Sequence, residues 1–231
     1  MKHLALHTCC APCLIGVYDL LASEYAQITV VFYNPNIAPR DEYLRRRDTC
    51  AQYAEENKIS FVEIDPAETK PLKTGAQGRE IPPIDNSFPV PAADRAAAGT
   101  MHAETDLQLQ LQRCCACYME RLTTVAAWAD KQAALGGPAY DSLATTLSIS
   151  PWQNLEAINK AGLQAVSHYP QLSFAQHDFR DYYRTAQNEA RNLGLYRQNY
   201  CGCLPSKEEA DRGRRQRKEL RKKKRSSENA S

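Results

Sequence analysis

Cysteine is the residue type in this sequence whose number and spacing could do chemistry. The chain has nine cysteines, and eight of them fall in three short segments: CCAPC at 9–13, CCAC at 114–117 and CGC at 201–203. Where thiols stay reduced, such clusters bind metal or take part in catalysis more often than they form structural disulfides. The ninth, Cys50, stands alone in a predicted helix and is best explained by packing.

The first two clusters together offer a metal site. Cys9 and Cys10 follow a predicted strand and precede a predicted helix, whose N-terminus favours the thiolate. Cys114 and Cys117 are three residues apart in a helix and therefore share a face, whereas Cys115 points elsewhere. Four thiolates suit a tetrahedral zinc or an iron–sulfur cluster. The alternatives are buried apolar cysteines in the first cluster and a zinc that only stabilises the insertion at 66–106.

A cysteine pair and a carboxylate are further candidates. Gly202 permits a tight turn between Cys201 and Cys203, so CGC predicts a redox dithiol or two ligands to a second metal, and two unrelated loop cysteines are the alternative. Asp178 follows a predicted strand in HDFRDYYR. It would be an oxygen ligand to iron, a general acid or a helix N-cap. His7, beside the first cluster, is the histidine that we single out for testing.

Alternating strands and helices must position these residues. Their order predicts an α/β fold with a doubly wound, mostly parallel sheet and helices on both faces. In such a sheet the first cluster lies outside the carboxyl ends of the strands, where ligands bind. The expected strands are 3–8, 28–33, 60–64, 140–147 and 172–177, and the expected helices are 13–25, 40–57, 107–134, 152–166 and 180–194.

The chain divides into one catalytic α/β domain, 1–205, and a tail, 206–231. Within the domain, the Pro-rich stretch 66–106 is expected to be a surface insertion. The tail is expected to be disordered or only loosely helical. It has eleven Lys and Arg and five acidic residues, a net charge of +6, whereas the rest of the chain carries −4. A basic tail on a mildly acidic body indicates a nucleic-acid partner.

Composition excludes several classes of protein. With 43% hydrophobic and 24% charged residues, the chain is neither disordered throughout nor collagen-like. No apolar run approaches the roughly 18 residues of a membrane-spanning helix, so we expect no membrane partner. The start of the chain lacks the apolar stretch of a signal peptide, which predicts a cytoplasmic location. CCAPC has no glycine to admit a phosphate, which disfavours an ATP-dependent enzyme.

Six motifs together resemble the QueH family of epoxyqueuosine reductases, in the family's order over residues 4–204. They are LHTCCAPC, FYNPNIAPRDEYLRR, RCCACYMERL, TTLSISPWQNLEAIN, HDFR and GLYRQNYCGC. The resemblance implies an adenine-nucleotide α-hydrolase-like sheet in which the cysteine motif replaces the nucleotide-binding loop. It also implies an oxidoreductase that completes queuosine biosynthesis by reducing the epoxide of epoxyqueuosine, at the wobble position of tRNA, to an alkene.

The resemblance also implies roles for single residues. The implied ligands of a 4Fe-4S cluster are Cys9, Cys10, Cys114 and Cys117. Cys201 and Cys203 match a pair proposed as a redox-active disulfide. A second, mononuclear iron is implied near the cluster, with Cys13, Asp178 or the CGC pair as candidate ligands. The sequence departs from the family at Cys115, which replaces a non-cysteine residue, in a longer Pro-rich stretch and in the additional basic tail.

The implied reaction sets further requirements. Epoxide reduction consumes two electrons and two protons and releases water, and without a nicotinamide or flavin motif an external electron donor is expected. A splayed tRNA loop base would stack on aromatic rings and lie near basic groups. A zinc-stabilised RNA-binding protein without catalysis is the alternative. Most of the tyrosines among the candidate RNA contacts are better explained as ordinary half-buried core residues. The candidates are Tyr33, Tyr118, Tyr182, Tyr183, Tyr196, Tyr200, Arg45, Arg121 and Arg197.

Overall fold

A five-stranded parallel sheet forms the centre of the computed structural model, which describes residues 2–67 and 101–228. The strand order is β3-β2-β1-β4-β5, and every neighbouring pair is parallel. Because the chain runs from the central β1 to one edge and then to the other, the sheet is doubly wound, which confirms the predicted fold class. The strands are β1 His3–His7, β2 Gln27–Phe32, β3 Ser60–Glu63, β4 Ser142–Thr145 and β5 Ser173–Phe174.

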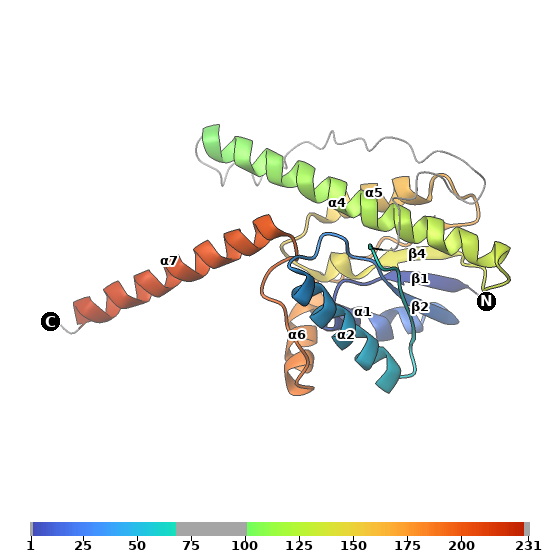
Figure 1. Ribbon diagram of the computed structural model, residues 1–231, viewed down its shortest axis with the longest axis horizontal. Coiled ribbons are helices and arrows are strands. Elements are labelled where there is room, and N and C mark those ends of the chain that lie inside the picture. Colours follow the sequence, from blue (N-terminus) through green and yellow to red (C-terminus); the bar gives the residue numbers. More distant parts are fainter. Residues whose placement is uncertain (1, 68–100, 229–231) are drawn as a thin grey trace.

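Helices cover both faces of this sheet (Figure 1). Helices α4 and α5 pack together on one face, and α1, α2 and α6 lie on the other. Helix α1 buries Leu14, Val17 and Leu21, apolar residues at helical spacing. The helices are α1 Ala11–Ala22, α2 Arg40–Glu56, α4 Met101–Ala134, α5 Leu155–Val166, α6 Tyr183–Asn192 and α7 Leu204–Glu228, with 3-10 turns η1 Thr146–Ile149 and η2 Arg180–Tyr182.

A buried histidine ties the carboxyl ends of the central strands together. His7 ends β1 and is fully buried. Its Nδ1 lies 2.8 Å from Thr145 Oγ1 at the end of β4, and its Nε2 lies 3.2 Å from the carbonyl oxygen of Tyr33 just after β2. Burial lowers the pKa of His7 to about 3, so the ring is neutral. Its Nε2–H then donates to the carbonyl and Nδ1 accepts from the threonine. These hydrogen bonds link the end of β1 to the ends of both neighbouring strands.

Several elements are shorter than the sequence predicts, among them one helix and one strand in the second half of the chain. The helix expected at 152–166 begins at Leu155, because Asn154 is its N-cap and accepts a hydrogen bond at Oδ1 from the backbone N–H of Ala157 at 2.9 Å. The strand expected at 172–177 is reduced to the two residues of β5. β5 lies at the edge of the sheet, where only β4 offers it backbone partners.

The second half of the fold begins with a helix that is longer than expected. Helix α4 starts at Met101 rather than at 107. Most of the predicted Pro-rich insertion, 68–100, lies outside the described residues. Within the described part of the chain, no helix is both long enough and apolar enough to cross a membrane.

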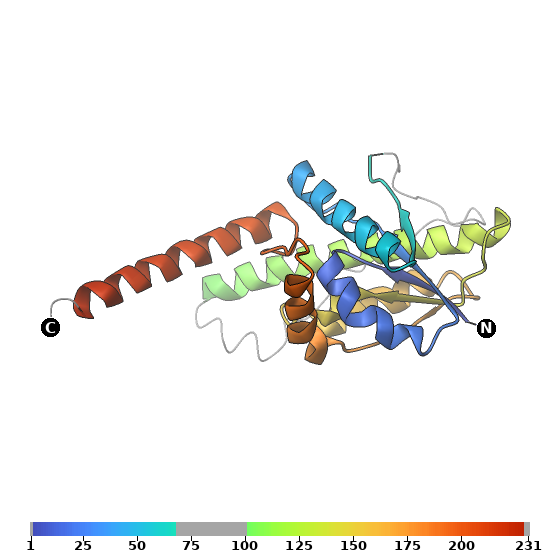
Figure 2. The same cartoon turned by 90° about the horizontal axis from the view of Figure 1, so that it is seen from below.

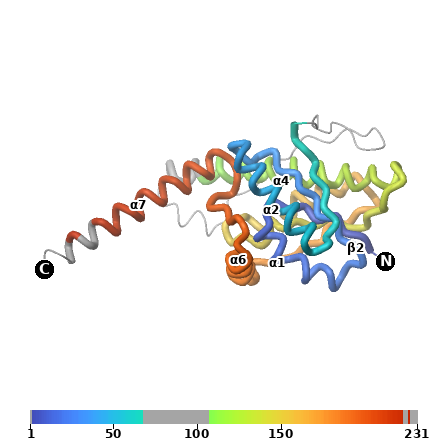
Figure 3. Tube along the Cα trace, turned by 60° about the horizontal axis from the view of Figure 1, so that its bottom comes forward, coloured from blue at the N-terminus to red at the C-terminus, as the bar shows by residue number. Residues whose placement is uncertain are grey.

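The basic tail forms a long helix, whereas the sequence predicted a tail that is disordered or only loosely helical. Helix α7 extends away from the body of the molecule (Figures 1, 2 and 3). Asp211 pairs with Lys207 at 3.2 Å and with Arg214, four and three residues away. Near the start of α7, Glu209 pairs with Arg113 of α4 at 3.2 Å. Oppositely charged residues at helical spacing support a helix that low hydrophobicity alone does not reveal.

Gly16 permits the close packing of α1 that fixes the position of α6. A Cβ at Gly16 would lie 2.7 Å from Ala186 Cβ on α6 and 2.3 Å from Ile149 Cδ1. We expect Gly16→Ala to lower the free energy of unfolding by about 1–3 kcal/mol through overpacking, measured by denaturant unfolding. Gly213→Ala on α7 is the matched control, because its Cβ meets only the flexible Arg217. Equal stability of the two variants would contradict this packing account.

Candidate metal centre

Three thiols gather where β1 turns into α1. The Sγ atom of Cys9 lies 3.8 Å from that of Cys10 and 3.7 Å from that of Cys13, and all three sulfur atoms lie within 4.8 Å of one another. Cys10 is the N-cap residue, but its side chain makes no capping hydrogen bond, so the thiol stays available as a ligand. The first turn of α1 brings Cys13, four residues after Cys9, onto the same side.

The pKa values of these thiols differ although all three are buried. Hydrogen bonding with Cys10 and Cys13 holds the pKa of Cys9 well below its usual range. Burial raises the pKa of Cys10, and hydrogen bonding with its two neighbours, together with burial, raises that of Cys13. Cys9 is therefore the first of the three to ionise. A metal would displace the remaining thiol protons on binding, which makes metal affinity depend on pH.

A second group of thiols comes from α4 and from the loop before α7. Burial raises the pKa of Cys114 to about 12, with the charges of Cys201, Cys117 and Cys203 adding to it. Burial also raises the pKa of Cys117, whose charged neighbours again include Cys201 and Cys203. The structure therefore brings the CCAC helix and the CGC loop, about 90 residues apart in sequence, into one electrostatic neighbourhood.

A buried arginine holds the CGC loop in place. Arg46 of α2 is 1% exposed and donates to the backbone carbonyls of Cys201 at 2.8 Å and Tyr200 at 3.1 Å. Its Nε donates to Glu42 Oε1 at 2.7 Å. Gly202, at φ +146°, adopts a backbone conformation that favours glycine, and a Cβ there would lie 3.0 Å from Ile37 Cγ1. The loop is thus packed against the turn that precedes α2.

Arg121 of α4 links the two groups of thiols. Its side chain is buried, and its charge faces Cys117, Cys201 and Cys9. Its Nε donates to the carbonyl oxygen of Cys117 at 3.1 Å, and its buried Nη2 has no hydrogen-bond partner among the described residues. The sequence offered Arg121 as an RNA contact. That prediction is wrong, because a side chain with 1% exposure cannot meet a phosphate.

Two glutamines that the sequence did not single out donate to the sulfurs. Gln198 Nε2 lies 2.8 Å from Cys10 Sγ, and Gln153 Nε2 lies 3.3 Å from Cys201 Sγ. Tyr118 donates its hydroxyl to Gln153 Oε1, which fixes which end of that amide faces the sulfur. Side-chain amides carry no spacing signal, so only their places in LYRQNY and SPWQN could have drawn attention to them.

The other candidates have different surroundings. Asp178 is half exposed and accepts from Arg180 Nε at 2.8 Å and from the Arg180 backbone N–H at 3.1 Å. Hydrogen bonding with Arg180 holds the pKa of Asp178 below its usual range. Cys50 is buried in a cluster of apolar residues around α2. Cys115 is buried in the main core, and Lys160 of α5 is the charged side chain that faces it.

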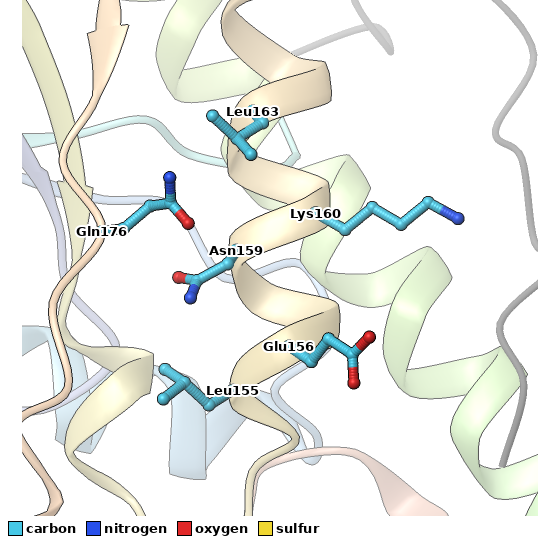
Figure 4. A pocket seen from close by; sticks show the side chains of 6 residues that line it. All are labelled: Leu155, Glu156, Asn159, Lys160, Leu163 and Gln176. Carbon is cyan, nitrogen blue, oxygen red and sulfur yellow. The ribbon is translucent and has the colours of Figure 1, made fainter. Parts of the chain in front are cut away.

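A pocket on the α5 side of the molecule is separate from the cysteines. It has a volume of about 480 Å³ and lies between α5 and the segment after β5 (Figure 4). None of the described cysteines lines it. Its lining residues are Leu155, Glu156, Asn159, Lys160, Leu163 and Gln176.

The donors at the carboxyl edge of the sheet fit a soft metal. Thiolates select zinc, copper(I) or iron–sulfur clusters over hard cations. The buried Nη2 of Arg121 would meet the negative charge that deprotonated thiols bring. The residues that could hold such a group come from three segments: Cys9, Cys10, Cys13, Cys114, Cys117, Cys201 and Cys203.

Comparison with known proteins places these residues in a family. A protein from Acinetobacter baylyi named epoxyqueuosine reductase QueH is 29% identical over 213 residues, covering 91% of this chain and 83% of that protein. Proteins of the same name from Staphylococcus epidermidis and Thermotoga maritima are 32% and 27% identical. They cover 87% and 88% of this chain and are themselves covered over 74% and 90%. The family model for epoxyqueuosine reductase QueH matches residues 4–81 and 93–209, so the chain belongs to the QueH family.

Proposed function

We propose that this protein reduces the epoxide of epoxyqueuosine in tRNA to the alkene of queuosine. Family membership supports this reaction. The observation that carries it is the gathering of buried and part-buried thiols from three distant segments around the Arg121 guanidinium. The proposed location is the cytoplasm, whose reducing conditions would keep these thiols reduced.

Cys9, Cys10, Cys114 and Cys117 are the residues that we propose as ligands of a 4Fe-4S cluster. Such a cluster, when bound, supplies electrons one at a time. The buried Arg121 would offset the negative charge of four thiolates, which burial otherwise disfavours.

A second iron is a further part of the proposal. Cys13 is the better-placed candidate ligand, because its Sγ lies 3.7 Å from that of Cys9. Asp178 would first have to release Arg180, to which its carboxylate is bound. We therefore favour Cys13 over Asp178, both as a ligand near the cluster and as the residue closer to the reaction.

Cys201 and Cys203 supply the second redox element in this proposal. Two thiols that become a disulfide release two electrons and two protons, and the epoxide takes up both pairs to give an alkene and water. An external donor would then reduce the disulfide. Gln153 orients the sulfur of Cys201 through its hydrogen bond, and Arg46 holds the loop backbone.

Conversion of the modified tRNA tests the function. The chain is reconstituted anaerobically with iron and sulfide, supplied with a chemical reductant and incubated with tRNA that contains epoxyqueuosine. Mass spectrometry of the digested tRNA should show the nucleoside lose one oxygen atom. A colourless, zinc-containing protein that binds the tRNA and leaves the nucleoside unchanged would instead support the RNA-binding alternative, since zinc has a filled d shell.

Serine substitutions test the ligand set. We expect Cys9→Ser, Cys10→Ser, Cys114→Ser and Cys117→Ser each to abolish the visible absorbance of the reconstituted protein, because a serine hydroxyl is a poor ligand for a soft metal. The iron content should fall with it. The matched controls are Cys115→Ser and Cys50→Ala, which lie in apolar cores and should retain iron and turnover. An essential Cys115 beside a dispensable Cys114 would show that the assignment is wrong by one residue.

Substitutions in the CGC loop separate a redox role from a ligand role. Cys201→Ser and Cys203→Ser should retain the absorbance of the cluster and reduce turnover at least tenfold, since neither variant can form the disulfide. Thiol titration of the wild-type protein before and after one turnover should show that two free thiols disappear. Disappearance of the cluster in either variant would make the pair ligands, and full turnover in both would exclude the redox role.

Removal of the distal part of α7 tests whether the basic helix binds tRNA. The deletion should start after Glu209, where the family match ends and the ion pair with Arg113 is spared. It removes residues 210–231, with ten Lys and Arg and three acidic residues. Turnover at saturating tRNA should stay unchanged, while the slope of log affinity against log salt becomes shallower by about 0.7–0.9 for each phosphate that the shortened protein no longer neutralises. Identical slopes would leave the helix without a role in binding.

A further inference from the structure

Trp152 presents a large aromatic surface to solvent beside the cysteine site. It is 76% exposed, although tryptophan is on average a highly buried residue type. It lies in the turn between η1 and α5, and the next residue, Gln153, donates to Cys201 Sγ at 3.3 Å. The exposed indole is therefore at the rim of the same sheet edge that gathers the thiols.

Tyr183 supports this indole from the protein side. The two rings meet edge to face, with centroids 5.1 Å apart and an interplanar angle of 85°. Tyr183 is the first residue of α6 and packs against the main core. Burial, followed by the charges of Cys13 and Cys10, raises the pKa of Tyr183, so its hydroxyl stays protonated and near the first cluster. An edge-to-face contact leaves at least one face of the indole free.

A nucleobase is the ligand that suits this free face. Single-stranded RNA loops are recognised by splayed bases that stack on aromatic rings, and the stacking tolerates any base. A cationic group that could meet a neighbouring phosphate lies close by, because the charge of Arg197 acts on Tyr183. A protein partner would require a contiguous apolar patch, whereas Trp152 is followed in the turn by two polar residues, Gln153 and Asn154.

We propose that Trp152, held in place by Tyr183, stacks a nucleobase of the tRNA anticodon loop next to the base that is reduced. This inference rests on the proposed function, since it takes the tRNA loop as the substrate. The stacked base would anchor the loop while the modified base reaches toward the thiols. Trp152 is thus a positioning residue and does not touch the reacting atoms.

Replacement of the indole tests the anchor. Trp152→Ala should raise the Kd for an anticodon stem-loop that carries epoxyqueuosine by roughly 5- to 150-fold, the range that corresponds to the removal of one base–aromatic stack. KM should rise in parallel, with kcat reduced less than KM is raised. Trp152→Phe should restore most of the affinity, because a smaller ring still stacks. Leu163→Ala is the control, since Leu163 is an apolar residue of α5 with 47% exposure on the wall of the separate pocket.

Fluorescence gives a second readout that is independent of turnover. The chain has two tryptophans, and Trp128 is only partly buried against the core, beside Tyr140. In Trp128→Phe the remaining emission comes from Trp152 and should be quenched when the stem-loop binds. In Trp152→Phe the emission comes from Trp128 and should not change. Both variants are first checked for iron content and for the circular dichroism of the wild type.

The outcomes separate this inference from the proposed function. Unchanged affinity of Trp152→Ala, or unquenched Trp152 in a protein that binds and reduces the RNA, would overturn the stacking and leave the reductase intact. Quenching and weakened binding in a protein that never reduces the nucleoside would support the stacking and contradict the proposed reaction. Equally weakened binding in Trp152→Ala and Trp152→Phe, without quenching, would show that the residue acts only in folding.

Discussion

The cysteine site depends on the electrostatic interaction between the buried guanidinium of Arg121 and the thiols around it. A cation removed from water costs several kcal/mol unless negative groups face it. Here the groups that face it are Cys117, Cys201 and Cys9, from three separate segments. Burial disfavours the thiolate of Cys117, and the Arg121 charge acts against this effect. The Arg121 charge and the thiols that face it thus take the place of water at the carboxyl edge of the sheet.

The rest of the fold serves to bring those segments together. The parallel sheet delivers the first cluster at its carboxyl edge, α4 crosses above it, and a second buried arginine, Arg46, holds the CGC loop by its carbonyl oxygens. Both arginines are buried and donate to backbone carbonyl oxygens of cysteines, Arg46 to Cys201 and Arg121 to Cys117. The helix α7 begins directly after this loop, so a basic arm extends from the site itself (Figure 3). The thiols and the basic arm are thus adjacent in sequence and in space.

Much of this arrangement could be predicted from the sequence, because it depends on order and spacing. Alternating strands and helices determine a doubly wound sheet, and a cysteine cluster after the first strand must then lie at its ligand-binding edge. The tertiary contacts were harder to predict from the sequence. Gln198 and Gln153 bind sulfur through amides that have no characteristic spacing. Arg121 looked like a surface charge on a helix, since burial of an ionised side chain depends on partners far away in sequence. The helical state of the tail rests on ion pairs, whereas its low hydrophobicity indicated disorder.

The most direct test of the central claim is X-ray absorption at the iron edge of the anaerobically reconstituted protein. Deprotonated thiols of the CCAPC and CCAC segments should give iron a first shell made entirely or mainly of sulfur, with iron–iron scattering from a cluster. If added zinc displaces the iron, the iron–iron scattering should disappear with it. A first shell of oxygen and nitrogen, or a protein that takes up zinc and no iron under the same conditions, would contradict the account.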